Sequence, residues 1–377
     1  MAPRILLLRA LGLGDFLTGV PAYRAVRRAF PGHRIVLAAP AALAPLVPLT
    51  GSVDELLPTG ELQPVAWSGE PPDLAVDLHG RGPASHRLAA DLHPRRLIVF
   101  GGEHAGGFDG PVWRADEHEG ARWCRLLRES GIPADPGDLR LAPPPRPAPV
   151  FTLLHPGAAA PARRWPADRF AVVARRLTSG GHDVRITGSA AERDLATRVA
   201  RLAGLTAEHV LAGQTSLADL AALTAAARLV ISGDTGLAHL GAAYARPSVT
   251  LSGPVPPSEW GPPDHPRHQV LWEGKPGYRG DPHGARADPA LRAITVDAVG
   301  RAADAALRAG SLGGRLRPRR VPDRPLTRTR TCGPSWFTRT ASGSASSASV
   351  WTCAPPSRNA APALTTAWPT GRRCTTR

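Results

Sequence analysis

The feature that most constrains the fold is an alternation of short apolar runs and amphipathic stretches on both sides of one proline-rich segment. That segment, residues 142–149, contains five prolines in eight positions, a density typical of linkers. Strand-like and helix-like patterns alternate before it and start again after it. Such alternation is typical of α/β domains with doubly wound parallel sheets. We therefore predict two such domains facing each other.

We place an N-terminal Rossmann-like domain at residues 1–141, the linker at 142–149 and a C-terminal Rossmann-like domain at 150–310. Expected strands cover residues 4–9, 34–39, 73–79, 96–100, 150–154, 183–187 and 228–231, with a last strand inside 247–254. Expected helices cover residues 15–30, 115–130, 166–177, 190–202, 216–226, 237–245 and 296–309. Ligands of such sheets bind at the carboxyl ends of the strands, so we expect the site in the cleft between the domains.

The formal charge of +15 suggests a nucleic-acid partner until the charge is located. Residues 311–377 hold 12 arginines, no lysine and one acidic residue, which leaves the first 310 residues a net charge of +4. We therefore expect no nucleic acid among the partners of the two domains. The last 67 residues contain only seven Leu, Val, Ile or Phe, too few to bury a core, and are expected to be a disordered, basic, low-complexity tail.

Two interpretations of this tail stay open. It is either a basic arm that touches an anionic membrane surface or nucleic acid, or an out-of-frame extension of GC-rich coding sequence. The second is favoured because the chain has 45 arginines and a single lysine, Lys275.

Cysteine use and hydropathy bear on the compartment. Cys124 is the only cysteine before residue 311, which predicts no disulfide framework and a reducing compartment. The apolar run at residues 5–8 is too short for a signal peptide or a membrane span. We expect a cytoplasmic protein, with peripheral contact at the inner membrane surface as an additional expectation.

Residues 232–240, Ser-Gly-Asp-Thr-Gly-Leu-Ala-His-Leu, connect an apolar run to an alanine-rich helical stretch. A glycine turn that opens into a helix directs backbone N–H groups and the positive end of the helix dipole to one point, where phosphate groups bind. The side chains of Asp234, Thr235 and His239 can add hydrogen bonds there. A purely structural alternative has Asp234 or Thr235 capping the helix.

Several enzyme classes lack their motifs in this chain. Gly12 and Gly14 begin a dinucleotide-binding pattern, but Leu17 stands where its third glycine belongs and no acidic residue ends the next strand. The chain has no Gly-Lys-Ser/Thr, no Asp-x-Asp, no Gly-x-Ser-x-Gly and no paired histidine spacing. We therefore expect no nicotinamide or flavin cofactor, no P-loop and no bound metal.

Two loops after predicted strands carry charged side chains that suit group transfer. Asp15 follows the first strand, where a lone carboxylate at a cleft can act as a general base or simply cap the helix. Arg163 and Arg164 precede Pro166, and a guanidinium at such a helix start can neutralise a diphosphate leaving group. The alternative is two solvated arginines.

Taken together, these segments resemble glycosyltransferase family 9, the ADP-heptose:lipopolysaccharide heptosyltransferases and their relatives. The matching motifs lie at residues 5–15, 20–22, 77–80, 155–158, 163–166, 186–189, 211–215, 233–239 and 252–254. The resemblance implies the GT-B architecture and an inverting, metal-independent transfer. The transferred sugar is a heptose or a related sugar, taken from an ADP-sugar to a glycan or glycolipid acceptor, as in lipopolysaccharide core biosynthesis. No cofactor is implied.

The resemblance also implies roles for individual residues. Asp15 matches the family's proposed catalytic base, which deprotonates the acceptor hydroxyl. Donor-binding positions are Arg163, where the family usually has a lysine, and Asp234, Thr235, Gly236 and His239. Gly14, Gly157 and Ser189 are expected to contribute loop or backbone contacts to the donor, and His79 and Arg81 to lie on the acceptor side.

The sequence departs from the family pattern at one loop, and three alternative functions stay open. Leu11 and Gly12 stand where the family often has serine, so no hydroxyl is expected from that loop. The alternatives are a family member that glycosylates a cell-wall glycan or a secondary metabolite, a non-catalytic nucleotide-sugar-binding protein, and another GT-B enzyme such as a nucleotide-sugar epimerase.

Overall fold

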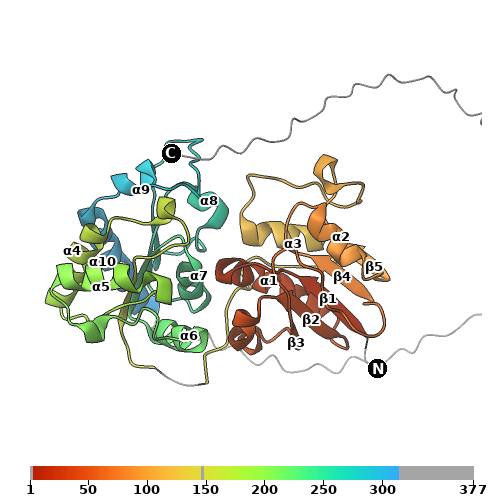
Figure 1. Ribbon diagram of the computed structural model, residues 1–377, viewed down its shortest axis with the longest axis horizontal. Coiled ribbons are helices and arrows are strands. Elements are labelled where there is room, and N and C mark those ends of the chain that lie inside the picture. The colour runs from red at the N-terminus through yellow and green to blue at the C-terminus, as the bar shows by residue number, and fades with distance from the viewer. Residues whose placement is uncertain (1–2, 146–147, 314–377) are drawn as a thin grey trace, which may run out of the picture. The chain divides into compact units, whose positions relative to one another are not determined.

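The structure is a computed structural model of the chain, and it describes residues 3–145 and 148–313 (Figure 1). The predicted tail lies outside these residues from position 314 onward. Residues 311–313, which we assigned to the tail, instead extend the last helix, α10 (Val296–Gly313). The two sheets described below belong to one compact unit.

Parallel strands form two five-stranded sheets, as predicted. The N-terminal sheet consists of β1 (Arg4–Leu8), β2 (Arg34–Ala39), β3 (Glu55–Pro58), β4 (Leu74–Asp77) and β5 (Arg96–Ile98). The C-terminal sheet consists of β6 (Thr152–His155), β7 (Val184–Ile186), β8 (Leu229–Gly233), β9 (Ser248–Leu251) and β10 (His268–Leu271). We did not predict β3 and β10, which are edge strands. Their residues are mostly half-buried and form no continuous apolar run.

The two sheets differ in strand order. The N-terminal sheet has the order β3-β2-β1-β4-β5, which is the Rossmann arrangement. The C-terminal sheet has the order β10-β9-β8-β6-β7, which is the flavodoxin-like arrangement. Strand order therefore reverses between β1 and β4 in one sheet and between β6 and β8 in the other. Ligands of open α/β sheets bind outside the carboxyl ends of the strands at such a reversal.

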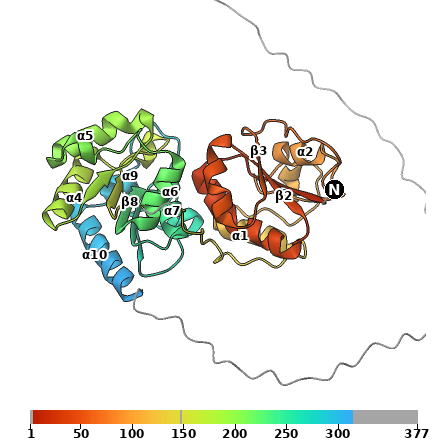
Figure 2. The same cartoon turned by 90° about the horizontal axis from the view of Figure 1, so that it is seen from below.

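Helices cover both faces of each sheet. Those of the N-terminal half are α1 (Leu13–Ala29), α2 (Ala84–Ala90) and α3 (Glu119–Glu129). Those of the C-terminal half are α4 (Ala167–Ser179), α5 (Arg193–Ala203), α6 (Leu217–Ala226), α7 (Gly236–Ala243), α8 (Pro257–Trp260), α9 (Pro289–Ala293) and α10. Figure 2 shows α10 beside α4, on the opposite side of the C-terminal sheet from α6 and α7.

Single 3₁₀ turns occupy several of the connections. They are η1 (Ala41–Leu46), η2 (Pro48–Thr50), η3 (Glu103–Ala105), η4 (Pro161–Arg163), η5 (Ala190–Glu192) and η6 (Ala207–His209). Of these, η4 and η5 lie in loops that follow strands of the C-terminal sheet and matter for the site described below.

The core explains why α1 and α7 meet. Along β1, Ile5 and Leu7 face a cluster with α1 and α3, while Leu6 and Leu8 face a smaller cluster that includes α2, as the two-residue period of a strand requires. The larger cluster continues from α1 into Leu237 and Leu240 of α7. Apolar burial therefore holds α1 against α7, and the first turns of both helices lie together.

Candidate functional site

A cavity of about 550 Å³ opens where the first turns of α1 and α7 meet. Seven predicted site residues line it: Gly14, Asp15, Arg163, Asp234, Thr235, Gly236 and His239. They come from the segments after β1, β6 and β8, which flank the strand-order reversals of the two sheets. The predicted residues Gly157, Ser189, His79 and Arg81 do not line it.

Asp15 is the third residue of α1 and not its cap. The cap position belongs to Gly12, and no side chain makes a capping hydrogen bond there, so the capping alternative is wrong for Asp15. The Asp15 side chain is 27% exposed, and its Oδ1 lies 3.5 Å from Nη2 of the buried Arg9. A carboxylate in this position faces the cavity from the positive end of α1.

Arg163 closes the η4 turn and is held in place through its neighbours. The Trp165 indole is buried and donates to the Ile294 carbonyl at 3.1 Å. A Cβ added at Gly233 would lie 3.0 Å from the Arg163 carbonyl oxygen, so a larger residue at the end of β8 would push this carbonyl away. The Arg163 Nε is buried and has no hydrogen-bond partner in the structure. Among residues 3–145 and 148–313, Arg163 is in no ion pair, and it is thus free to bind an anion.

The turn from β8 into α7 presents unused hydrogen-bonding groups. Thr235 occupies the cap position of α7, where the capping alternative placed it, but its side chain makes no capping hydrogen bond. The Thr235 Oγ1 is buried and has no partner. Together with the free N–H groups of the first turn of α7, this hydroxyl forms a site suited to phosphate oxygens.

Asp234 and His239 form a close pair beside this turn. His239 Nε2 lies 3.7 Å from Asp234 Oδ1, and both side chains are largely buried. Burial raises the pKa of Asp234, although His239 and Arg163 act in the opposite direction. Burial also lowers the pKa of His239, so the imidazole is neutral at pH 7. The ring makes an edge-on contact with Trp260, with centroids 5.9 Å apart.

Two glycines allow the two helix starts to approach each other. A Cβ at Gly14 would lie 3.1 Å from His239 Cδ2, and a Cβ at Gly236 would lie 2.8 Å from the Leu13 side chain. The sequence analysis names Gly236 as a donor-binding position. The contact that the structure shows there is with Leu13 on α1, so the steric demand on Gly236 comes first from helix packing.

Gly157 and Ser189 both lie against Glu192, a residue that the sequence analysis missed. The Ser189 N–H and Oγ donate to Glu192 Oε2 at 2.8 and 2.9 Å. A Cβ at Gly157 would overlap the Glu192 carboxylate, which itself lines the cavity. The spacing Ser189-x-x-Glu192 is a capping box, a sequence signal that predicts this interaction.

His79 and Arg81 lie after β4, outside the cavity. The His79 N–H donates to Asp77 Oδ1 at 2.8 Å, and burial lowers the pKa of the His79 imidazole. Asp15 and Arg9 both influence its charge, so His79 lies on the Asp15 side of the site. Arg81 is exposed.

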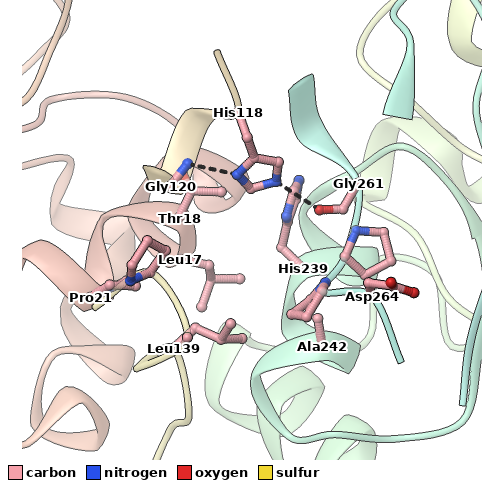
Figure 3. A pocket seen from close by; sticks show the side chains of 14 residues that line it. Leu17, Thr18, Pro21, His118, Gly120, Leu139, His239, Ala242, Gly261 and Asp264 are labelled. Atoms are coloured by element: carbon pink, nitrogen blue, oxygen red, sulfur yellow. Dashed lines mark hydrogen bonds between the residues drawn. The ribbon is translucent and has the colours of Figure 1, made fainter. Parts of the chain in front are cut away.

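A second cavity of about 310 Å³ adjoins the first at His239, which lines both (Figure 3). Its walls are mostly apolar and include Leu17, Leu139 and Ala242. His118 lies at its rim: Nδ1 accepts from the Gly120 N–H at 3.2 Å, so the proton is on Nε2, which lies 3.0 Å from the Gly261 carbonyl and donates to it. No local motif marks this cavity, because its lining comes from five separate segments.

In residues 3–145 and 148–313, no group of three or more His, Cys, Asp or Glu side chains could hold a metal ion. Within the same residues, no helix is both long and apolar enough to cross a membrane.

Comparison with known proteins places this geometry in a family. Residues 140–277 match the sequence model of glycosyltransferase family 9 (heptosyltransferase). The ADP-heptose lps heptosyltransferase II of E. coli is 25% identical, with a TM-score of 0.65 over 81% of this chain and 98% of that one. A family 9 glycosyl transferase from Veillonella parvula is 20% identical, with a TM-score of 0.65 over 81% and 97%.

A third solved structure, E. coli heptosyltransferase WaaC with ADP, is 20% identical, with a TM-score of 0.58 over 79% of this chain and 98% of that one. No curated protein sequence gives a significant match.

The fold and these matches define the class of protein: it is a glycosyltransferase with the GT-B architecture. Within that class, the chain contains a domain of glycosyltransferase family 9, which confirms the resemblance seen in the sequence.

Proposed function

We propose that the protein is an inverting, metal-independent glycosyltransferase that moves a heptose or a related sugar from an ADP-sugar to a glycan or glycolipid acceptor. One observation carries the proposal. A single cavity is lined by a partly exposed carboxylate, Asp15, by a guanidinium, Arg163, that has no ion pair within the described residues, and by a helix start with an unused hydroxyl, Thr235. A sugar transfer from a nucleotide diphosphate needs a base for the acceptor and a cationic, hydrogen-bonding site for the leaving group.

On the donor side, the diphosphate binds between Arg163 and the first turn of α7. Arg163 supplies charge, and Thr235 Oγ1 and the N–H groups of α7 supply hydrogen bonds. His239 is neutral because it is buried, so it donates a hydrogen bond without adding a full charge. The carboxylate oxygens of Asp234 and Glu192 accept hydrogen bonds from hydroxyl groups of the donor. Gly14, Gly157, Ser189 and Gly236 shape this wall through packing.

On the acceptor side, Asp15 removes the proton of the attacking hydroxyl. The acceptor oxygen forms a bond to the anomeric carbon, the bond from that carbon to the diphosphate oxygen breaks, and ADP leaves toward Arg163. Attack from the side opposite the leaving group inverts the anomeric centre. His79 and Arg81, which lie after β4, belong to the acceptor-facing half of the protein in this proposal.

The preference for ADP-heptose rests on similarity. The solved structure at 25% identity is named an ADP-heptose lps heptosyltransferase II, and this chain covers nearly all of it. The acceptor is defined less narrowly. The apolar cavity that meets the donor cavity at His239 favours an acceptor with an apolar part, such as a glycolipid, over a fully polar glycan.

The remaining assignments follow from this mechanism. We propose that residues 1–141 form the acceptor domain and residues 150–310 the donor domain, joined by the linker at 142–149. We also propose that the protein works in the cytoplasm, where nucleotide sugars are made, and touches the inner membrane surface when its acceptor is a lipid.

A donor panel tests the proposal. Thermal unfolding is measured with ADP-, UDP- and GDP-heptose, and a bound donor raises the midpoint by mass action. We expect the largest rise with ADP-heptose. We also expect ADP release with a deacylated lipopolysaccharide-core acceptor, unchanged by EDTA, and a product of inverted anomeric configuration by NMR. A rise with ADP-heptose but no transfer to any acceptor would favour a non-catalytic binder, and loss of transfer in EDTA would refute metal independence.

A further inference from the structure

A buried arginine that the proposed mechanism does not use lies directly beneath Asp15. Arg9 follows β1 and is fully buried. Its Nη2 donates to Glu119 Oε1 at 2.9 Å and to Thr18 Oγ1 at 3.1 Å, and lies 3.5 Å from Asp15 Oδ1. Its Nε donates to the Asp15 carbonyl and its Nη1 to the Leu78 carbonyl. One side chain thus joins the first turn of α1 to the end of β4 and the start of α3.

Glu119 is the main partner of this arginine. It is the first residue of α3 and is 5% exposed. Its carboxylate also accepts from Trp123 Nε1 at 2.9 Å and from Arg122. Burial by itself would raise the pKa of Glu119, but the charges of Arg9 and Arg122 lower it. Glu119 is therefore a buried anion at neutral pH.

We propose that Arg9 and Glu119 are positioning residues for Asp15. Arg9 fixes the first turn of α1, and Glu119 is the main counter-ion of Arg9. The Asp15 carboxylate therefore remains directed at the cavity. The inference rests on the proposed role of Asp15 as the base.

The geometry supports this division of charge. The Arg9–Glu119 contact is short and fully buried, whereas the Arg9–Asp15 contact is longer and its carboxylate is 27% exposed. Because Coulomb attraction strengthens as distance and solvent exposure fall, Arg9 interacts more strongly with Glu119. An arginine with no other counter-ion would hold the base in its ionised, paired form and weaken it as a proton acceptor.

Other titratable groups face Asp15 as well, and they must stay constant in any test. They are Tyr23 on α1, His79 after β4, and Asp234 and His239 from β8 and α7. Within residues 3–145 and 148–313 none of them shares a hydrogen bond or ion pair with Glu119, although the Glu119 charge also acts on His239. Arg9 contacts both carboxylates directly, so a change at Glu119 reaches Asp15 mainly through Arg9.

The first test replaces Glu119 with Gln, which keeps the shape and an acceptor for Trp123 but removes the charge. We expect kcat for ADP release from ADP-heptose, with a deacylated lipopolysaccharide-core acceptor, to fall roughly tenfold. The acidic limb of the kcat profile should move to lower pH by about one unit, because Asp15 becomes the remaining counter-ion of Arg9. The affinity for ADP should not change.

A matched control lies in the turn that leads into the same helix. Glu117 is also partly buried and pairs with an arginine, Arg125 Nε, at 2.9 Å, but it does not contact Arg9. Glu117→Gln should leave kcat and its pH profile at wild-type values. A second variant, Arg9→Lys, keeps the buried charge but loses the contacts of the planar guanidinium. It should lower kcat without moving the acidic limb to lower pH.

The outcomes separate the two proposals. If Asp15→Asn keeps wild-type turnover, the base is misassigned and the proposed mechanism is wrong. If Asp15→Asn is inactive while Glu119→Gln lowers only the unfolding midpoint, leaving kcat and its pH profile unchanged, the positioning role alone is refuted. If Glu119→Gln does not fold, Arg9→Lys decides: wild-type kcat in that variant overturns the positioning role.

Discussion

The two sheets of this protein hold their site arginines in opposite ways. Arg9, after β1 of the N-terminal sheet, is fully buried, and its hydrogen bonds reach Glu119, Thr18, Asp15 and Leu78. Arg163, after β6 of the C-terminal sheet, lines the cavity with its Nε unpartnered. A cation with its partners already in place organises its surroundings, whereas a cation without one is ready for an anionic ligand. In the proposed mechanism the base accordingly follows a strand of the N-terminal sheet, and the donor diphosphate binds beyond the strands of the C-terminal sheet.

The largest effect expected from this comparison is the loss of kcat when Asp15 is replaced. Asp15→Asn should reduce kcat by on the order of 10²–10⁴, the range for losing a general base, because the amide cannot accept the proton of the acceptor hydroxyl. The affinity for ADP, measured by calorimetry, should remain near wild type, since the proposed diphosphate contacts come from the C-terminal sheet. If ADP affinity is lost while turnover per bound donor is kept, Asp15 belongs to the donor site, and the proposed separation of the base from the diphosphate site is wrong.

The second effect concerns Arg163. Arg163→Ala should weaken ADP binding by roughly 10- to 100-fold, which corresponds to the loss of about 1.5–3 kcal/mol from a charge-assisted hydrogen bond. It should also slow transfer, because negative charge grows on the leaving diphosphate. Arg163→Lys should recover much of both. The free sugar should bind equally to all three proteins.

A neighbouring arginine provides the control for this prediction. Arg164 already donates through its Nε to the Ala158 carbonyl at 2.9 Å and does not line the cavity. Arg164→Ala should leave ADP affinity within about twofold of wild type. An equal loss in both variants would mean that the loop, and not the Arg163 charge, determines binding.

The contrast between the sheets also shows what the sequence can predict. Strands with continuous apolar runs, such as β1, β2 and β8, were located correctly because burial on both faces of a parallel sheet leaves a clear pattern. The half-buried edge strands β3 and β10 leave no such pattern and were missed. The strand orders, which differ between the two sheets, depend on long-range pairing that no local sequence feature encodes.

The site shows the same limit. Asp15, Arg163 and the turn at Asp234 were predicted because each follows a recognisable strand within a short motif. Glu119 was missed because it reaches the site from 110 positions beyond Arg9 in the chain, and its local sequence is that of an ordinary amphipathic helix. Glu192 could have been predicted from the sequence, since its capping box with Ser189 is a local pattern.

The third prediction tests the packing between the helix starts. A methyl group at Gly236 would press on Leu13, so Gly236→Ala should destabilise the fold by about 1–3 kcal/mol, the usual cost of overpacking, and weaken ADP binding severalfold. Gly236→Val should be worse. Denaturant unfolding and ADP titration measure the two effects.

A second substitution separates the two causes at this position. Leu13→Ala in the Gly236→Ala background removes the obstacle on α1 and should restore much of the lost stability. If ADP affinity returns with it, helix packing explains the glycine. If stability returns and ADP affinity does not, the added methyl group obstructs the diphosphate directly.

The smallest effect is a difference in acid sensitivity between the sheets. The buried His86 of the N-terminal half lies 2.6 Å from the Asp77 carboxylate. His268 on β10 has no such partner, and burial together with Arg267, His265 and Arg140 lowers its pKa to about 4. Above pH 6.5 His268 is neutral in both the folded and unfolded chain and contributes no pH dependence. Between pH 6.5 and 4 this histidine takes up a proton only in the unfolded chain. The free energy of unfolding therefore decreases as the pH is lowered through this range.

His268→Gln should remove this contribution. At pH 5.5 the loss in the wild type corresponds to about 1 kcal/mol of unfolding free energy, allowing for the partial exposure of the ring. The Gln side chain can still hydrogen-bond to Ser248 Oγ, which lies 2.8 Å from His268 Nδ1, so the two proteins should be nearly equal in stability at pH 7. Urea unfolding at pH 7 and 5.5 measures the difference. If the variant loses as much stability as the wild type between these two values, the acid sensitivity of the protein arises elsewhere than at the β10 edge.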